Sequence, residues 1–330
     1  MAITLDGTNG IETPTINGTA EHVTSVTGFK NRIINGAMVI DQRNAHASFT
    51  VGTGATSFVA DRFFCYSSGG QTFGANSAGL PAGSGFNYGL TLLPQTGATS
   101  VQLTQKIESY NAMDLAAQTV TLSFWLYTSS LSGTASYVQP YTPTAQDNYA
   151  GINYGASQAL SYTNGAWVKN TFTFSSSNGS MNFANGAAIL FNFVSAVGAT
   201  IWVTGVQLEK GSTATSFDYR PYGTELSLCQ RYFQTCIGSF NYRMSGQFYT
   251  TTSGRVIFNH YVPMRTAPSL SVSGLTGQAI GFGTTTFSNN NVNQVLGIDA
   301  SSWDLTGATV AKAAYQQLTY DGTAQLSAEL

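Results

Sequence analysis

Short runs of alternating apolar and polar residues, separated by polar turns, occupy the chain from residue 31 to residue 208. In the run TVTLSFWLY, Val120, Leu122, Phe124 and Leu126 alternate with Thr, Ser and Trp. A period of two predicts strands with one buried face. Strands are predicted at Ala37–Gln42, Ser57–Tyr66, Gly89–Leu93, Ser100–Glu108, Thr119–Tyr127, Tyr137–Tyr141, Trp167–Phe174, Ala187–Val194 and Thr200–Leu208. Many short strands joined by turns predict an all-β fold with a jelly-roll-like antiparallel β-sandwich over residues 29–222.

One segment has the period of a helix. Leu226, Cys229 and Phe233 are spaced by three and four residues, which places them on one helical face. Gly223–Thr224 supplies a break and a cap before them. The spacing predicts a linking helix over residues 223–236.

The chain on either side of these elements has weaker patterns. Alternation returns after the helix and predicts a smaller C-terminal β domain over residues 237–330. Pro263 and Pro268 suit an edge strand and a corner there. Residues 1–28 alternate only in short pieces, so we expect an N-terminal attachment arm that a partner chain holds. A short helical turn is predicted at Asn111–Ala117, with Asn111 as its cap.

Composition narrows the class of partner. Of the 330 residues only 8% are charged and 12% are aromatic, and the net charge is -2. A surface of hydroxyls, amides and aromatic rings suits neutral ligands such as glycans. Nucleic acid is excluded as a partner, because it requires clustered Lys and Arg. The chain has no apolar run of about 18 residues that would predict membrane insertion, and its start has no signal-peptide pattern.

Some residues are predicted to lie in the interior. Cys65, Cys229 and Cys236 are too few for a disulfide framework, so buried free thiols are expected. Trp125 and Trp202 lie within apolar strands and are predicted to be core residues.

Catalytic and metal-binding patterns are weak. The 15 acidic residues stand singly, and His22, His46 and His260 are far apart in sequence. The chain has no pattern for a metal, a nucleotide or a nucleophile. We therefore expect no enzyme activity, no catalytic residues and no cofactor. Asp147–Asn148 is a weak candidate for Ca²⁺, and a polar turn is the favoured interpretation.

Aromatic residues in polar surroundings are the best candidates for ligand binding. Tyr141, Tyr149 and Tyr154 stand among Gln, Asn, Ser and Gly, and Trp303 follows a polar loop in the C-terminal domain. Aromatic faces stack on the C–H faces of sugars, and amides bond hydroxyl groups, so these residues are candidate glycan-binding residues. The alternative is that they are ordinary strand residues or contacts between copies of the chain.

Two sets of residues have structural interpretations. Arg220 and Tyr222 stand between the sandwich and the helix, where we expect them to clamp the chain. Asp41, Arg43 and the pair Asp61–Arg62 stand where strands meet turns. In a chain with so little charge, we expect them to pair with one another or to cap turns.

Five ordered pieces carry a family resemblance. They are NRIINGAMVIDQR (Asn31–Arg43), ADRFF (Ala60–Phe64), LTQKIESYNAMDLAAQTVTLSFW (Leu103–Trp125), the junction GVQLEKGSTATSFDYRPYGTELSLCQRYF (Gly205–Phe233) and PMRTAPSLSV (Pro263–Val272). Together with the C-terminal AEL, they resemble bacteriophage tail fibre and receptor-binding proteins that have a jelly roll like that of carbohydrate-binding modules.

The resemblance implies a β-rich homotrimer in the virion that is assembled in the host cytoplasm. It implies attachment to a tail or baseplate protein through the N-terminal arm and recognition of a host surface polysaccharide or another receptor. Leu226, Cys229 and Phe233 are then candidates for a trimer contact near a threefold axis, or for the domain junction. Two alternatives remain, a polysaccharide depolymerase tailspike and a purely structural baseplate component.

Overall fold

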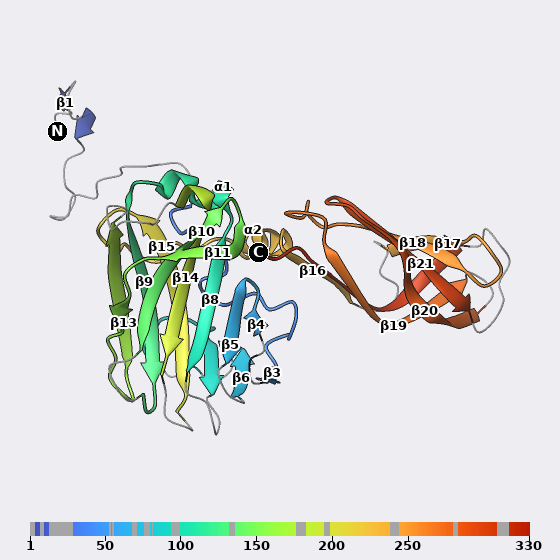
Figure 1. The fold of residues 1–330 in the computed structure, drawn as a ribbon, viewed down its shortest axis with the longest axis horizontal. Coiled ribbons are helices and arrows are strands. Elements are labelled where there is room, and N and C mark those ends of the chain that lie inside the picture. Colours follow the sequence, from blue (N-terminus) through green and yellow to red (C-terminus); the bar gives the residue numbers. More distant parts are fainter. Residues whose placement is uncertain are drawn as a thin grey trace.

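Two antiparallel sheets pack face to face in the first part of the chain (Figure 1). The computed structural model describes residues 4–6, 10–12, 29–52, 54, 56–67, 71–75, 80, 82–93, 100–131, 136–175, 183–194, 199–237, 244–279, 283–308 and 317–330. The first sheet has the order β11-β10-β14-β8-β5-β4, with β12 also paired to β10. Its strands are β4 (Thr56–Ala60), β5 (Phe63–Ser67), β8 (Val101–Ile107), β10 (Tyr137–Ala145), β11 (Asn148–Tyr154), β12 (Gln158–Ala159) and β14 (Ala187–Phe193).

The second sheet has the order β13-β9-β15-β7-β6-β3. Its strands are β3 (Ser48–Val51), β6 (Gln71–Ala75), β7 (Leu90–Leu93), β9 (Thr119–Thr128), β13 (Trp167–Ser175) and β15 (Ile201–Lys210). Short helical turns, α1 (Ser109–Ala112), η1 (Met113–Leu115) and η2 (Phe183–Asn185), connect strands, and β1 (Thr4–Asp6) pairs with β2 (Gly10–Glu12). The predicted antiparallel sandwich is therefore present.

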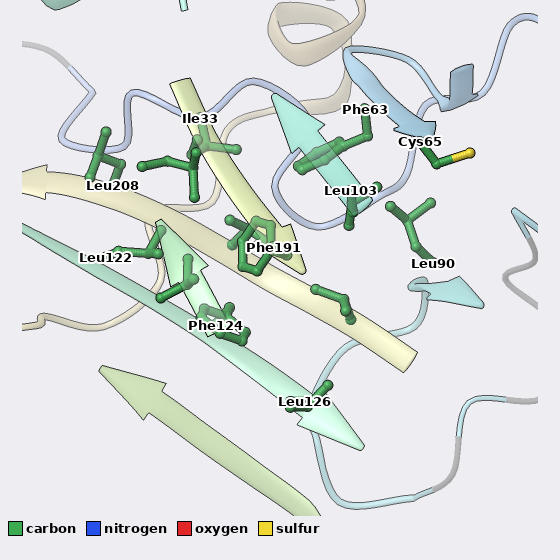
Figure 2. Close-up of a cluster of buried hydrophobic side chains, with 14 of the residues drawn as sticks. Ile33, Phe63, Cys65, Leu90, Leu103, Leu122, Phe124, Leu126, Phe191 and Leu208 are labelled. Carbon is green, nitrogen blue, oxygen red and sulfur yellow. The ribbon is translucent and has the colours of Figure 1, made fainter. Parts of the chain in front are cut away.

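The core lies between the two sheets. Leu122, Phe124 and Leu126 of β9 point toward Leu103 of β8 and Phe191 of β14 (Figure 2). The rings of Phe124 and Phe191 meet edge to face, with centroids 4.9 Å apart. Burying each such side chain contributes about 1.5–3 kcal/mol, so this layer holds the sheets together.

A single helix, α2 (Tyr222–Gln230), links the sandwich to a third sheet. The third sheet has the order β16-β22-β17-β18-β21-β20-β19, and β22 also pairs with β19, which closes a ring of strands. Its strands are β16 (Phe233–Ile237), β17 (Met244–Phe248), β18 (Gly254–Asn259), β19 (Ser269–Ala279), β20 (Gly283–Leu296), β21 (Ala300–Ala308) and β22 (Gln317–Ser327). Within the described part of the chain, no helix has the length and apolarity needed to cross a membrane.

The predicted strand Ala37–Gln42 is wrong. Ala37 and Gln42 lie in turns, and residues 38–41 have no regular structure. Asn35 and Met38 have positive φ angles of 61° and 60°, which an extended strand does not allow. The Asn35 side chain accepts a hydrogen bond from Ile40 N at 3.0 Å and donates one to Ile40 O at 2.7 Å. These bonds close a loop, so the apolar residues pack without strand pairing.

The predicted strand Ser57–Tyr66 is two strands, β4 and β5. They pair antiparallel around a turn at Asp61–Arg62, where Arg62 has a φ of 71°. The sequence placed Asp61–Arg62 where strands meet turns, but the apolar residues on both sides of the pair favoured one long strand over a hairpin.

Two predicted helix boundaries are also wrong. The first helical turn starts at Ser109 and not at Asn111, because the Asp147 carboxylate accepts bonds from Ser109 N (2.7 Å) and Ser109 Oγ (3.0 Å). The linking helix ends at Gln230, and Phe233 already pairs with Ser327 in the third sheet. Strand pairing with β22 replaces helical bonds after Gln230.

Polar and charged side chains join the sandwich to the C-terminal domain. Glu329 forms ion pairs with Arg62 and, at 3.0 Å, with Arg43. Arg231 binds Glu108 at 2.8 Å, and Tyr232 donates to the same carboxylate at 3.0 Å. The C-terminus lies beside α2 and the sandwich (Figure 1), so the last residues tie the two parts together.

The apolar face of α2 is covered within one chain. Leu226 and Cys229 pack in a cluster with Ile34, Ile40 and Tyr232. Phe233 is also buried, with the Arg43 guanidinium 3.6 Å from its ring centroid. Of the five residues considered for a trimer or junction contact, Tyr222 is the most exposed, at 64%.

Asp61 gives the junction a testable pH dependence. Burial raises the pKa of Asp61 from 3.8 to about 6, against the opposing effect of Arg43. The folded state then holds a proton that the unfolded state has lost between these pH values, so stability increases as pH falls from about 6 toward about 4. We expect wild type to gain about 1–3 kcal/mol over this range relative to Asp61→Asn. Urea denaturation at several pH values measures this difference, and parallel profiles for the two proteins would contradict it.

Candidate functional site

A row of side chains crosses the outer face of the first sheet. Tyr66 of β5 pairs with Gln102 of β8, Gln102 with Asn192 of β14, and Asn192 with Tyr137 of β10. Their neighbours Cys65, Leu103, Phe191 and Val138 point into the core. Neighbouring strands lie about 4.8 Å apart, so Tyr66 and Tyr137 stand about 14 Å from one another. The row therefore has an aromatic ring at each end and amides between them.

A second row continues this face. Ala188 of β14 pairs with Tyr141 of β10, and Tyr141 with Tyr154 of β11. The two tyrosine rings have centroids 5.6 Å apart, and Tyr154 is 51% exposed whereas Tyr141 is only 6% exposed. Tyr154 therefore offers a ring to solvent, and Tyr141 supports it from below. We call the two rows the tyrosine face: Tyr66, Gln102, Asn192, Tyr137, Ala188, Tyr141 and Tyr154.

The other predicted site residues have different positions. The hydroxyl of Tyr149 shares its one proton between the carbonyl oxygens of Ala187 (2.7 Å) and Ile107 (3.0 Å). Burial raises the pKa of both Tyr141 and Tyr149, so these hydroxyls stay protonated. Tyr149 is thus a support for the sheet. Trp303 lies on β21 of the third sheet, away from the tyrosine face, and its side chain lies outside the described residues.

Both amides in the first row have unused hydrogen-bonding groups; Gln102 is half-buried and Asn192 is only 6% exposed. Gln102 Nε2 donates to Asn192 Oδ1 at 3.4 Å, a long bond. Among the described residues, this bond leaves the Gln102 oxygen and the Asn192 NH₂ group without another protein partner. Donors and acceptors between two rings match a ligand that carries hydroxyl groups on an apolar ring.

A cavity of about 220 Å³ lies where this face meets the C-terminal residues. It is lined by Thr56, Ser57, Phe58, Phe64, Lys106, Glu329 and Leu330. Thr56 and Phe58 pair with Tyr66 and Phe64, so the cavity adjoins the first row. Lys106 Nζ donates to Leu330 O at 2.9 Å and lies 5.2 Å from the Phe64 ring centroid. Burial and the nearby Arg62 lower the pKa of Lys106.

Asp147, the weak Ca²⁺ candidate, and the histidine His260 have other contacts. Both carboxylate oxygens of Asp147 accept bonds from Ser109. His260 binds Ile298 O at 2.8 Å and Ser301 Oγ at 2.9 Å, and burial lowers its pKa. In the part of the chain that the structure describes, no three His, Cys, Asp or Glu residues group as metal ligands would.

Sequence reasoning missed Tyr66, Gln102 and Asn192. Their outward positions follow from the alternation within each strand, but the row depends on β5, β8, β14 and β10 being neighbours. Strand order is a long-range property, so no local pattern brings these residues together.

Comparison with known proteins gives distant structural similarity. No protein-family model and no curated protein matches the sequence. The enzymatically active domain of tailspike protein 4 from bacteriophage CBA120 is similar at a TM-score of 0.34 and 17% identity, over 55% of this chain and 21% of that chain.

Carbohydrate-binding modules with a β-sandwich are similar at the same level. The CBM22-1 xylan-binding domain of Paenibacillus barcinonensis Xyn10C gives a TM-score of 0.28 and 15% identity, over 50% of this chain and 99% of that domain. TmCBM61, in complex with β-1,4-galactotriose, gives a TM-score of 0.30 and 12% identity, over 55% of this chain and 99% of that module. These TM-scores are below 0.5, so the case for a function rests on the residues of the tyrosine face.

Proposed function

We propose that this chain is a noncatalytic, structural and adhesive component of a phage tail, and that its tyrosine face binds a host surface glycan. The observation that carries the proposal is the row Tyr66, Gln102, Asn192 and Tyr137, in which rings flank amides across one sheet face. Sugar rings stack on the tyrosines, and their hydroxyl groups bond the amides between them. Lys106 pairs with Ala188, so it lies at the β8 end of the second row, where its ammonium group donates to Leu330 O. The first row consists of two tyrosines and two amides without a charge, so it suits a neutral segment of glycan.

The phage assignment rests on the ordered motifs of the sequence. They support a tail fibre in the virion, attached to a tail or baseplate protein by the N-terminal arm and assembled as a homotrimer. Three linked copies raise the avidity of a weak site by about 10²–10⁴ without a new contact. Electron microscopy of particles with a tagged N-terminus tests the attachment, and light scattering of the purified chain tests the trimer.

Removing the two rings of the first row is expected to weaken glycan binding. The double variant Tyr66→Ala/Tyr137→Ala loses stacking area at both ends, and we expect affinity to fall about 10–100-fold, since a few large aromatic contacts carry most of the binding energy. Biolayer interferometry on a panel of immobilised bacterial capsules, O-polysaccharides and teichoic acids measures this loss.

The matched control is Tyr110→Ala, because Tyr110 is 70% exposed and lies on α1, off the tyrosine face. Equal affinities for the double variant, the control and wild type would reject the tyrosine face as the site. Release of new reducing ends from a bound polysaccharide would identify a depolymerase instead. Particles that adsorb normally with the double variant would favour a structural baseplate role.

A further inference from the structure

The outer face of the second sheet carries a separate row of aromatic rings. Tyr127 of β9 pairs with Trp167 of β13 on one side and with Trp202 of β15 on the other. The Tyr127 ring centroid lies 5.5 Å from that of Trp167 and 5.1 Å from that of Trp202, both in edge-to-face geometry. Trp125 is the next outward residue on β9. We call these four residues the tryptophan strip.

The strip corrects the prediction that Trp125 and Trp202 are core residues. Both are partly exposed, as are Tyr127 and Trp167. The inward positions of β9 are filled by Leu122, Phe124 and Leu126, which pack against the first sheet. Alternation therefore turns the tryptophans out toward solvent.

The segment 82–88 forms a wall beside the strip. Gly205 has a φ of 62°, and a Cβ there would lie 2.6 Å from Phe86 Cε2 and 3.2 Å from Trp125 Cδ1. The hydroxyl of Thr204 donates to Tyr88 O at 2.6 Å, and Gly83 lies beside the Trp167 indole. A glycine in the left-handed region lets Phe86 sit against the sheet next to Trp125. The strip is thus held in place on one side by a fixed segment.

The chemistry of the strip selects its ligand. Along β9 and β13, both described in full, every outward position is an aromatic residue, a Ser or Thr, or Lys169. On these two strands, no aliphatic side chain widens the strip into the apolar core expected of an interface between stable subunits. A single lysine is too little charge for a nucleic acid or an acidic polymer. The partly exposed indole rings, with the exposed Thr171 hydroxyl on the same face of β13, match the apolar faces and hydroxyl groups of a neutral sugar chain.

We propose that the tryptophan strip is a second glycan-binding site, which takes a neutral polysaccharide. It extends the proposed adhesive function, yet it depends on none of the residues of the tyrosine face. The outer faces of a two-sheet sandwich point in opposite directions, so one copy binds two sugar chains and links them.

Tryptophan fluorescence tests the proposal, because three of the four tryptophans in the chain belong to the strip. The purified 330-residue chain is titrated with dextran, β-1,3-glucan, mannan and galactan, with alginate as an acidic comparison. We expect at least one neutral polysaccharide to give a saturable emission change. Trp202→Leu keeps an apolar side chain but removes the flat indole ring, and it weakens this binding at least 10-fold. Tyr66→Ala/Tyr137→Ala leaves it unchanged.

A second variant guards against a folding defect. Thr171→Arg keeps every ring of the strip and adds a bulky charge at an exposed position on the same face of β13, so it weakens the response as well. No emission change with any neutral polysaccharide, or a change with alginate alone, overturns the proposal. An emission change that both variants retain at wild-type strength also overturns the proposal. A different oligomeric state in either variant overturns it too, because the strip would then be a contact between copies of the chain. If Tyr66→Ala/Tyr137→Ala binds glycan as wild type does while the strip variants lose binding, only the function proposed for the tyrosine face is overturned.

Discussion

Glu329→Gln is expected to lower the free energy of unfolding by about 3–5 kcal/mol, because it leaves a buried arginine without its counter-charge. The side chains of Arg62 and Glu329 are only 2% and 9% exposed. Arg62 also donates to Lys106 O at 2.6 Å and lies 3.5 Å from the centroid of the Tyr232 ring. These contacts hold the guanidinium in place, so it cannot move to water when the carboxylate becomes an amide.

The matched control is Asp114→Asn, which removes an ion pair at the surface. Arg32 and Asp114 are 29% and 49% exposed, so the loss there is expected to stay below about 1 kcal/mol. Urea denaturation followed by near-ultraviolet circular dichroism measures both variants. Similar losses for the two would show that the junction pair is no more than a surface pair.

The strand pattern could be predicted from the sequence where one face of a strand is buried. In β9, Val120, Leu122, Phe124 and Leu126 have no exposed surface, as the alternation of TVTLSFWLY predicts. The segment from Asn35 to Ile40 is apolar as well, but a side-chain amide closes it into a loop. The apolar residues of this segment predict that it is buried. Whether its backbone forms a strand or a loop depends on the hydrogen bonds of the Asn35 side chain, which the apolar pattern does not show.

The candidate site could be predicted only in part. The sequence pointed to Tyr141, Tyr149 and Tyr154 because they lie close together along the chain. The structure places Tyr141 and Tyr154 side by side and uses Tyr149 as a support. The rows of both faces arise from pairing between distant strands, which a single sequence does not show.

The tryptophans show a different limit. The alternation already assigned Trp125 to the face opposite Phe124, but the apolar character of the residue favoured a core position. Large aromatic residues are often only partly buried, so apolar character alone does not assign them to the core. Where periodicity and residue type disagree, periodicity gave the correct side of the sheet.

The few charged residues allowed several ion pairs and turn caps to be predicted from the sequence. Asp41 accepts bonds from Asn44 N (3.0 Å) and His46 N (2.9 Å), and Arg43 lies 3.5 Å from Asp61, which agrees with the expected caps and pairs. Arg62 instead pairs with Glu329 from the far end of the chain. In a chain with 8% charge, several of the buried charges therefore join the sandwich to the C-terminal domain.

Arg220 joins three segments at the exit of the sandwich, and its removal is expected to have a similarly large effect. Its guanidinium donates to Ile33 O at 3.0 Å and to both oxygens of Glu225, at 3.1 and 3.2 Å, and it also donates to Asn31 O. The side chains of Arg220 and Glu225 are only 4% and 10% exposed. The clamp therefore fixes the start of the sandwich, the irregular segment after β15 and α2 to one another.

Arg220→Ala is expected to destabilise the protein by about 3–5 kcal/mol, because Glu225 then remains buried without a cation. Arg220→Lys keeps the charge but not the planar fork, so it restores only part of this loss. Tyr222→Ala, two residues along and at an exposed position, stays within about 0.5 kcal/mol of wild type. Urea denaturation of the three variants measures the order. A value for Arg220→Ala as small as that for Tyr222→Ala would mean that the junction does not depend on this arginine.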